Sequence, residues 1–219
     1  MPLPDLLGVF GGTFDPVHTG HLRLAEEARE GLGLAEVRWI PAGNPAHRDI
    51  PGVDAAHRLA MVRLAVAGNS AFTVDASEVE SPAPSFTVPT LERLRAEAAG
   101  ERALVLLLGA DAFAGLPTWH RWRDLFSLAH IAVFHRPGFP IDPASLPAVL
   151  ATEFSRREVS DSRALRRSPA GGVIAAPLTP LAISATRIRQ LVSSGGSPRY
   201  LLPEAVVDYI DRHRLYRPA

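Results

Sequence analysis

The stretch Gly11-Gly12-Thr13-Phe14-Asp15-Pro16-Val17-His18-Thr19-Gly20-His21 decides the fold of this chain. The short apolar run 7–10 precedes it and predicts a buried strand. An apolar pattern typical of a helix follows it, over residues 21–32. The stretch is therefore a glycine-containing turn between a strand and a helix, with two histidines where the helix begins.

This junction has the features of a phosphate site. Glycines let the chain turn tightly and let backbone N–H groups approach a ligand. The helix N-terminus adds free N–H donors and a partial positive charge. His18 and His21 are three residues apart, so we expect them to share one helix face and to point at the same anion. Gly20 would leave space for a phosphate close to the backbone.

Other interpretations of the junction are weaker. It is not a Walker loop, because no Lys-Ser or Lys-Thr follows the glycines, and it lacks the spacing G-x-G-x-x-G. The histidines could be a metal pair, but no third ligand with suitable spacing is nearby. They could also be solvated residues at a helix end. Packing alone does not explain paired glycines and paired histidines at one junction.

Composition limits the classes of function. The chain has 219 residues, enough for one α/β domain with a sizeable core. Lys plus Arg and Asp plus Glu both number 23, which argues against binding nucleic acid through a broad basic surface but allows a small basic pocket. The absence of cysteine excludes disulfides and thiolate chemistry. We see no secretion signal and no membrane-spanning run, the longest being 103–110, and so expect a cytoplasmic protein.

Strand and helix patterns alternate along the chain. Apolar runs typical of strands lie at 7–10, 37–40, 72–74, 104–108, 131–134 and 173–175. Helical patterns lie at 21–32, 55–67, 90–99, 111–114, 185–193 and 203–212. This alternation predicts a Rossmann-like α/β fold, a doubly wound parallel sheet in a single domain over residues 1–219. We expect 139–172 to be a variable, partly exposed insertion and 183–219 to carry the C-terminal helices.

Two loops add polar groups near the expected site. Residues 41–48 follow the second strand, and Asn44, His47 and Arg48 would bring polar and cationic groups to the same sheet edge. Taken alone, this loop could equally be a solvated surface loop. Ser85-Phe86-Thr87 precedes a helix, where the hydroxyls could cap the helix or the free N–H groups could bind a carboxylate.

Three later segments each allow two interpretations. Gly109 and Asp111, at a strand end, could hold ribose hydroxyls or form a helix cap. Trp119 could pack in the core or stack on a flat ring. In Ile183–Arg189, Ser184 would cap a helix and Arg189 with Thr186 would make a second phosphate site, whereas we expect Arg187 to be solvated.

Together these motifs resemble those of bacterial nicotinate-nucleotide adenylyltransferases. Residues 18–21 match the His/Thr-x-Gly-His motif of that nucleotidyltransferase superfamily, and 183–189 match its Ile-Ser-x-Thr-x-Ile-Arg signature. The resemblance runs from about 8 to 216. The elements that narrow it to the pyridine-nucleotide branch are 44–48, 85–87, 109–111, 116–119 and 136–138. The chain departs from the family at Ala46, Arg48 and Phe86, where proline, lysine and tyrosine are common.

The resemblance implies adenylyl transfer from ATP to nicotinate mononucleotide in NAD synthesis. Catalysis would rest on His18, His21 and Arg189. The implied ATP-binding residues are Gly11, Gly12, Thr13, Phe14, His18, His21, Gly109, Asp111, Ser184, Thr186 and Arg189. The implied nicotinate mononucleotide-binding residues are Asn44, His47, Arg48, Ser85, Phe86, Thr87, Trp119 and Arg136. Mg²⁺ would arrive with the ATP phosphates, held by no protein metal site. No nucleic-acid or membrane partner is expected, and a homo-oligomer stays open.

Three alternatives remain at this point. The acceptor could be nicotinamide mononucleotide, or a different phosphate such as phosphopantetheine. The chain could also be a nucleotide-binding regulator that has kept the fold without turnover.

Overall fold

The structure is a computed structural model that describes residues 5–45, 51–98 and 102–218. In these residues one six-stranded sheet has the order β3-β2-β1-β4-β5-β6. Its strands are β1 (Leu6–Gly12), β2 (Glu36–Pro41), β3 (Phe72–Val74), β4 (Ala103–Gly109), β5 (His130–His135) and β6 (Val173–Pro177). The pairs β1–β4, β4–β5 and β5–β6 are parallel. The predicted Rossmann-like parallel sheet is confirmed.

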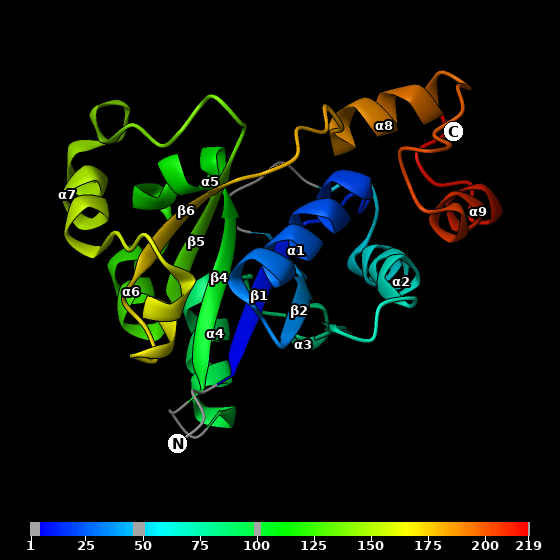
Figure 1. The fold of residues 1–219 in the computed structure, drawn as a ribbon. Coiled ribbons are helices and arrows are strands. Elements are labelled where there is room, and N and C mark those ends of the chain that lie inside the picture. The colour runs from blue at the N-terminus through cyan, green and yellow to red at the C-terminus, as the bar shows by residue number, and fades with distance from the viewer. Residues whose placement is uncertain (1–4, 46–50, 99–101, 219) are drawn as a thin grey trace. The chain divides into compact units, whose positions relative to one another are not determined.

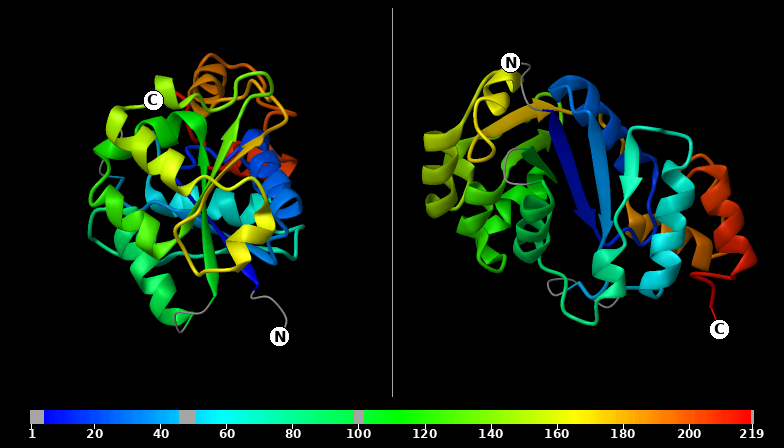
Figure 2. Two further views of the ribbon diagram at one scale, coloured as in Figure 1. Left: turned by 60° about the vertical axis from the view of Figure 1, so that its left-hand side comes forward. Right: turned by 90° about the horizontal axis from the view of Figure 1, so that it is seen from below.

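In each unit helices pack against strands, as α2 does against β3 and α5 against β4 (Figures 1 and 2). The longer ones are α1 (Thr19–Leu32), α2 (Ala55–Val66), α4 (Thr87–Glu97), α7 (Ala148–Arg157), α8 (Ala185–Ser193) and α9 (Glu204–Arg212). The shorter ones are α3 (Ser77–Glu80), α5 (Ala110–Ala114), α6 (Leu125–Leu128) and the 3₁₀ turns η1 (Leu116–Thr118), η2 (Trp122–Asp124), η3 (Pro143–Ser145) and η4 (Ser162–Arg166). The six predicted helices are present with small changes at their ends, whereas α3, α6 and α7 were not predicted.

The strand order reverses direction between β1 and β4. From β1 the chain first builds outward through β2 and β3, and it then returns to the other side of β1 with β4, β5 and β6. β1 and β4 pair in register, with Leu6 opposite Ala103 and Val9 opposite Leu106. In open sheets of this kind, ligands bind beyond the carboxyl ends of the strands where the order reverses. The glycine-rich turn leaves β1 at that edge.

The chain divides into two compact units. The first unit comprises Met1–Phe10, Ala25–Arg38 and Phe86–Pro180, and the second comprises Gly11–Leu24, Trp39–Ser85 and Leu181–Ala219. In the first unit, the side chains of Ala103–Leu108 in β4 are buried along the strand. Continuous burial of this kind is typical of a parallel strand that is covered on both faces.

The segment 139–172 belongs to the first unit and contributes to its core. Its polar residues are mostly exposed, but Leu150 and Phe154 of α7 and Leu165 of η4 are buried. The ring of Phe154 lies 5.9 Å from that of Phe113, between centroids. Whether this segment is an insertion relative to other chains stays a prediction.

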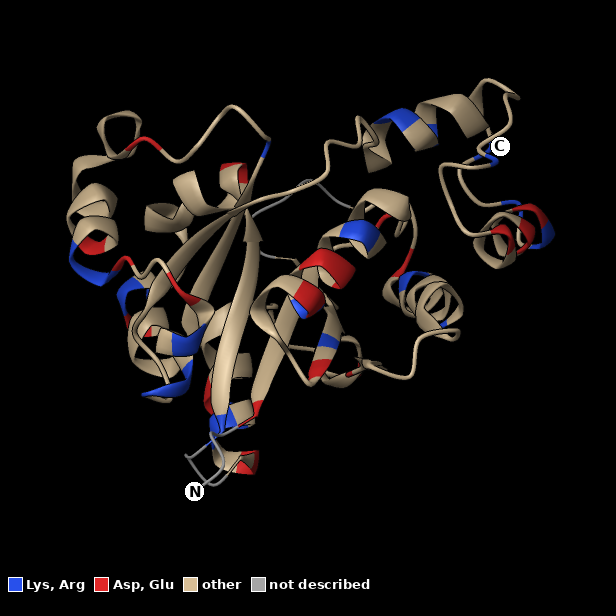
Figure 3. Cartoon of the chain, in the orientation of Figure 1, with Lys and Arg blue, Asp and Glu red and all other residues tan. Residues whose placement is uncertain are grey.

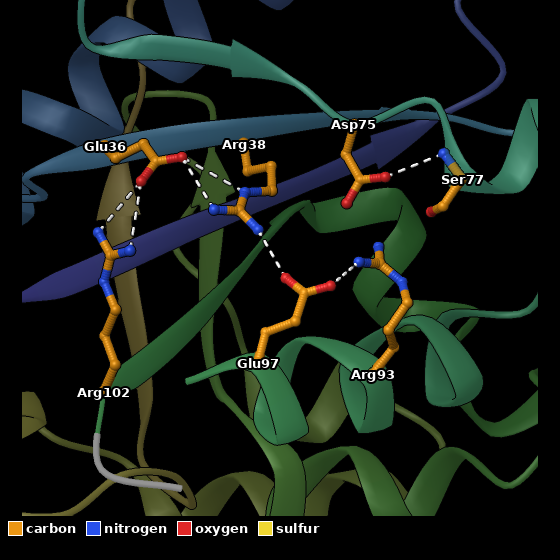
Figure 4. Close-up of polar contacts among 7 residues, drawn as sticks. All are labelled: Glu36, Arg38, Asp75, Ser77, Arg93, Glu97 and Arg102. Carbon is orange, nitrogen blue, oxygen red and sulfur yellow. Dashed lines mark hydrogen bonds and ion pairs between the residues drawn. The ribbon is translucent and has the colours of Figure 1, made fainter. Parts of the chain in front are cut away.

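A network of ion pairs lies at the amino ends of strands in the first unit. Figure 4 shows Glu36 accepting hydrogen bonds from Arg38 and Arg102, while Glu97 accepts from Arg38 and Arg93. Glu36 begins β2 and Arg102 directly precedes β4, so the network lies at the amino ends of these two strands. No helix in the described ranges is long and apolar enough to cross a bilayer.

Candidate nucleotide-phosphate site

The loop between β1 and α1, residues 13–18, requires a glycine before it. A Cβ on Gly12 would lie 2.9 Å from the ring of Phe14. Phe14 has a φ of 51° and turns its ring inward, where it is buried against Trp39 and meets His21 edge-on at 5.1 Å. We predicted that Phe14 binds ATP. Because its side chain is buried, only its backbone remains for that contact.

His18 and His21 lie side by side at the start of α1. Their rings stack with 3.7 Å between centroids and 23° between planes. The helix begins at Thr19, so His18 lies just before it and the prediction that both histidines share one helix face is wrong. They meet instead because the His18 N–H donates to Nδ1 of His21 at 3.2 Å. Since Nδ1 accepts this bond, the ring proton of His21 lies on Nε2.

His18 is buried as a neutral imidazole. Its exposed fraction is 6%, and within the described part of the chain its Nδ1 has no hydrogen-bond partner. Burial lowers the pKa of His18 to about 4, because desolvation disfavours the imidazolium. A Cβ on Gly20 would lie 3.1 Å from this ring, so the space expected there for a phosphate is occupied by His18 itself.

The start of α8 lies beside the same loop. Ser184 caps the helix, as predicted, by accepting a hydrogen bond from the Arg187 N–H at 3.3 Å. Ser184 and Thr186 are exposed, and so is Arg187, as expected. Arg189 reaches back to the loop: its Nη1 donates to the carbonyl of Asp15 at 2.7 Å and lies 3.6 Å from the Asp15 carboxylate. The second unit therefore brings a guanidinium to the loop that carries the histidines.

Asp15 is a buried carboxylate that sequence reasoning left without a role. Its exposed fraction is 6%. Oδ2 accepts from the Gly52 N–H at 2.7 Å, and Oδ1 accepts from the hydroxyl of Tyr216 at 2.7 Å. Tyr216 was not predicted either, because 201 residues separate it from Asp15 and no local pattern reports such a contact.

Arg58 joins the loop after β1 to the loop after β2. Its Nη1 donates to the carbonyls of Thr13 at 2.7 Å and Ala42 at 2.5 Å, and its Nη2 donates to that of Gly43 at 2.9 Å. Desolvation lowers the pKa of this buried guanidinium, while the charge of Asp15 opposes that shift. A sequence signal existed and was missed. Arg58 is an arginine in the apolar stripe of α2, where Leu59, Met61 and Val62 are also buried.

Hydrogen bonds to Ser85 fix the loop after β2. The Ser85 hydroxyl accepts from the N–H groups of Gly43 at 2.9 Å and Asn44 at 3.2 Å. Ser85 therefore does not cap the next helix: Phe86 occupies the N-cap of α4, and no side chain caps it. Asn44 is exposed. The predicted site residues His47 and Arg48 lie outside the described residues.

Gly43 is required for a close approach of backbone. A Cβ there would lie 2.0 Å from the carbonyl oxygen of Glu78, in α3, and no shift of a flexible side chain would relieve that clash. Together with Arg58 and Ser85, this contact fixes the path of the chain that leads to Asn44.

The first unit holds the other predicted residues. The rings of Phe86 and His120 lie 4.7 Å apart between centroids, so the start of α4 lies beside the segment after η1. Thr87 is the first residue of α4, where backbone N–H groups have no partner within the helix. Trp119 in that segment is half-buried, whereas Trp39 and Trp122 are buried in the core.

Three further predicted residues lie at carboxyl ends of strands in the first unit. Gly109 ends β4 and is the N-cap of α5, while Asp111 is exposed in the first turn. The interpretation of Asp111 as a cap is therefore wrong. Arg136 directly follows β5 and is exposed. The described residues contain no cluster of three His, Cys, Asp or Glu that could hold a metal ion.

The parallel sheet with this strand order and a histidine-bearing turn after β1 define a protein of the nucleotidyltransferase class. Residues 9–191 match the model of the cytidylyltransferase-like family. A protein of Dechloromonas aromatica named "Probable nicotinate-nucleotide adenylyltransferase" is 63% identical over 98% of this chain and 99% of its own length. A protein of Pseudomonas fluorescens with the same name is 52% identical over 96% of this chain and 97% of its own length.

The fold is also that of a solved enzyme. The nicotinic acid mononucleotide adenylyltransferase of Plasmodium falciparum, complexed with NaAD, superposes with a TM-score of 0.70 at 15% identity, covering 97% of each chain. The chain belongs to the nicotinate-nucleotide adenylyltransferase family of the cytidylyltransferase-like proteins.

Proposed function

We propose that this chain transfers the adenylyl group of ATP to the phosphate of nicotinate mononucleotide, in a step of NAD synthesis. A phosphate oxygen of the acceptor attacks the α-phosphorus of ATP, the bond from that phosphorus to the bridging oxygen breaks, and pyrophosphate leaves. The products are nicotinate adenine dinucleotide and pyrophosphate. The observation that carries the proposal is the stacked pair His18–His21 at the N-terminus of α1. His18 ends the same loop whose Asp15 carbonyl accepts a hydrogen bond from Arg189.

The two histidines act as donors to the phosphates. Phosphoryl transfer of this kind needs alignment and electrostatic stabilisation more than a strong base, because the acceptor phosphate is already an anionic nucleophile. His18 is neutral at pH 7, so it contributes a neutral N–H rather than a full positive charge. The orphaned Nδ1 of His18 fits this role, since a buried polar atom without a partner is typical of a group that a ligand completes.

Arg189 supplies the positive charge for the β- and γ-phosphates. Ser184 and Thr186 offer hydroxyls at the start of α8, where the N–H groups also favour an anion. Mg²⁺ would bind phosphate oxygens and water and neutralise part of the triphosphate charge.

The acceptor is assigned mainly to residues of the first unit. Trp119 would stack on the pyridine ring, and N–H groups of 85–87 and 118–119 would bind the carboxylate. The start of α4 and the Trp119 segment lie side by side, which fits such a pocket. Arg136, with Asn44 of the second unit, would bind the mononucleotide, whereas Gly109 and Asp111 would hold the ribose of ATP. We place the reaction in the cytoplasm, because its charged substrates do not cross membranes unaided.

An acceptor panel tests the function. The protein is incubated with ATP, Mg²⁺ and one of nicotinate mononucleotide, nicotinamide mononucleotide or phosphopantetheine, and pyrophosphate release is followed. We expect nicotinate mononucleotide to be preferred over nicotinamide mononucleotide by about tenfold to a hundredfold in kcat/KM, because a carboxamide would turn N–H against N–H and leave a buried group unpaired.

The outcomes separate the alternatives. Equal or better turnover of the nicotinamide form would overturn the specificity and leave adenylyl transfer intact. Turnover of phosphopantetheine alone would replace the acceptor class. ATP binding without pyrophosphate release on any acceptor would indicate a nucleotide-binding regulator.

A further inference from the structure

The Asp15 carboxylate gathers groups from three other segments of the second unit. Asp15 itself lies in the loop after β1, Gly52 precedes α2, Arg189 lies in α8, and Tyr216 follows α9. A carboxylate buried to this degree is costly unless its oxygens are paired. Each oxygen has a neutral donor at 2.7 Å, one from the Gly52 N–H and one from the Tyr216 hydroxyl.

The contact between the Arg189 guanidinium and the Asp15 carboxylate is long. Arg189 donates to the main-chain carbonyl of Asp15 at 2.7 Å, but its Nη1 lies 3.6 Å from Oδ2, beyond a strong charge-assisted bond. Arginine and carboxylate normally form two parallel hydrogen bonds when both are free to do so. Here Nη1 donates to the main-chain carbonyl instead, and each carboxylate oxygen already accepts one hydrogen bond, from Gly52 or from Tyr216, so a forked pair would have to share these oxygens.

We propose that Asp15 is a positioning residue for Arg189 and that Tyr216, by occupying Oδ1, keeps Arg189 available for ATP. The inference rests on the proposed function, in which Arg189 contacts the β- and γ-phosphates. Asp15 fixes the guanidinium through its carbonyl and draws it near through its charge. Tyr216 limits that attraction, so that ATP does not have to break a forked ion pair in order to bind.

The hydroxyl of Tyr216 is suited to this role. Burial, together with the adjacent charge of Asp15, raises the pKa of Tyr216 well above its ordinary value. The phenol therefore remains a donor throughout the working pH range. The charge of Arg58 opposes part of this rise in the pKa of Tyr216.

The Tyr216→Phe variant tests the proposal, with Tyr209→Phe as its matched control. Tyr209 lies on α9, and its hydroxyl meets Nδ1 of His57 at 3.0 Å rather than Asp15. Loss of a hydrogen bond to a charged group typically corresponds to about tenfold or more in affinity. We expect Tyr216→Phe to raise the KM for ATP about tenfold, with kcat and the KM for the acceptor within about twofold. Tyr209→Phe should match the wild type.

A double-mutant cycle separates positioning from folding. In an Arg189→Ala background, Tyr216→Phe should add no further rise in KM for ATP, because its effect passes through Arg189. Equal effects of Tyr216→Phe in both backgrounds, or an unchanged KM for ATP, would overturn the proposal. Thermal denaturation of each variant checks that it is folded. If Tyr216→Phe does not fold, Asp15→Asn is compared in the same two backgrounds and must show the same dependence on Arg189.

Binding of a non-hydrolysable ATP analogue, measured by calorimetry, tests the role of Tyr216 independently of whether the protein transfers an adenylyl group. A wild type that binds the analogue but transfers no adenylyl group would refute the proposed function. The ratio of analogue affinities between wild type and Tyr216→Phe would still decide the role of Tyr216: a ratio near ten supports it, and a ratio near one refutes it.

Discussion

At the scale of single residues, the site depends on groups whose burial sets their charge. His18 is held in the folded protein as a neutral ring, with a pKa of about 4 instead of 6.5. Each oxygen of the buried Asp15 side chain accepts a hydrogen bond, from the Gly52 N–H or from the Tyr216 hydroxyl. Both residues lie in the motif quoted first, yet only the histidine had a predicted role. A motif identifies which residues meet near a ligand, but their protonation depends on neighbours that come from elsewhere in the chain.

The pH dependence of stability follows from His18. Between pH 6.5 and about 4 the unfolded chain protonates this residue and the folded chain does not. The stability is therefore complete above pH 6.5 and falls as the pH drops toward 4, by at most about 3 kcal/mol. We expect urea unfolding of His18→Asn to show a weaker loss of stability between pH 7 and 4.5 than the wild type. Parallel pH profiles for the two proteins would contradict this, and His120→Asn, at an exposed histidine, provides the control.

Two arginines of α8 give a second prediction. Arg189→Ala should lower kcat/KM for ATP by roughly tenfold to a hundredfold, the loss typical of a hydrogen-bonded charge. Arg187→Ala should change it by less than about twofold, because an exposed charge two residues along the helix faces away. Steady-state kinetics on both variants decides the matter. Comparable losses would show that the ligand-facing side of α8 is wrongly assigned.

At the scale of elements, the strands and most helices were predictable because their apolar patterns are local. Helix α7 was missed, since prolines, arginines and serines dominate the segment 139–172. Its signal was nevertheless present: Leu150 and Phe154 are four residues apart and both are buried. The capping role expected for Ser85 failed for a different reason. Its hydroxyl is taken by backbone groups of the loop after β2, which lies far away in sequence.

The buried face of α7 gives a prediction about stability. Phe154→Ala should reduce the free energy of unfolding by about 3–5 kcal/mol, because it removes a fully buried ring and leaves a cavity. Val149→Ala, on the same helix at 48% exposure, should change it by less than about 1 kcal/mol. Chemical denaturation of both variants measures the difference. Near-equal midpoints would mean that the segment 139–172 does not share the core of the first unit.

At the scale of the whole molecule, charge is balanced and dispersed. Figure 3 shows Arg and the acidic residues Asp and Glu spread over many helices and loops, whereas β4 and β6 carry no charged residue. The contacts that complete the site were the hardest to predict, because they join distant segments. Arg58 could have been found from the sequence, because it is an arginine among the apolar residues of α2. No local sequence pattern points to Tyr216.

The zero net charge predicts how the protein behaves in solution. Solubility should be lowest near pH 7 at low salt, since like charges then do least to keep molecules apart. Precipitation by polyethylene glycol, measured at pH 7 and pH 5.5, tests this, because histidines gain charge as the pH falls. A lower precipitation threshold at pH 5.5 than at pH 7 would show that local patches, not the net charge, control association.

The bond between Asp15 and Tyr216 has a consequence for how the protein is made. Translation delivers residue 216 only 201 residues after residue 15, so a nascent chain carries the histidine motif long before the tyrosine that completes it. Until that residue leaves the ribosome, the Asp15 carboxylate lacks one of its donors, and burying it is correspondingly costly. Premature termination or removal of the last few residues by a protease would produce chains that keep every recognisable motif and lack the finished phosphate site. An intact segment after α9 is therefore required for the loop after β1 to have its full set of hydrogen bonds.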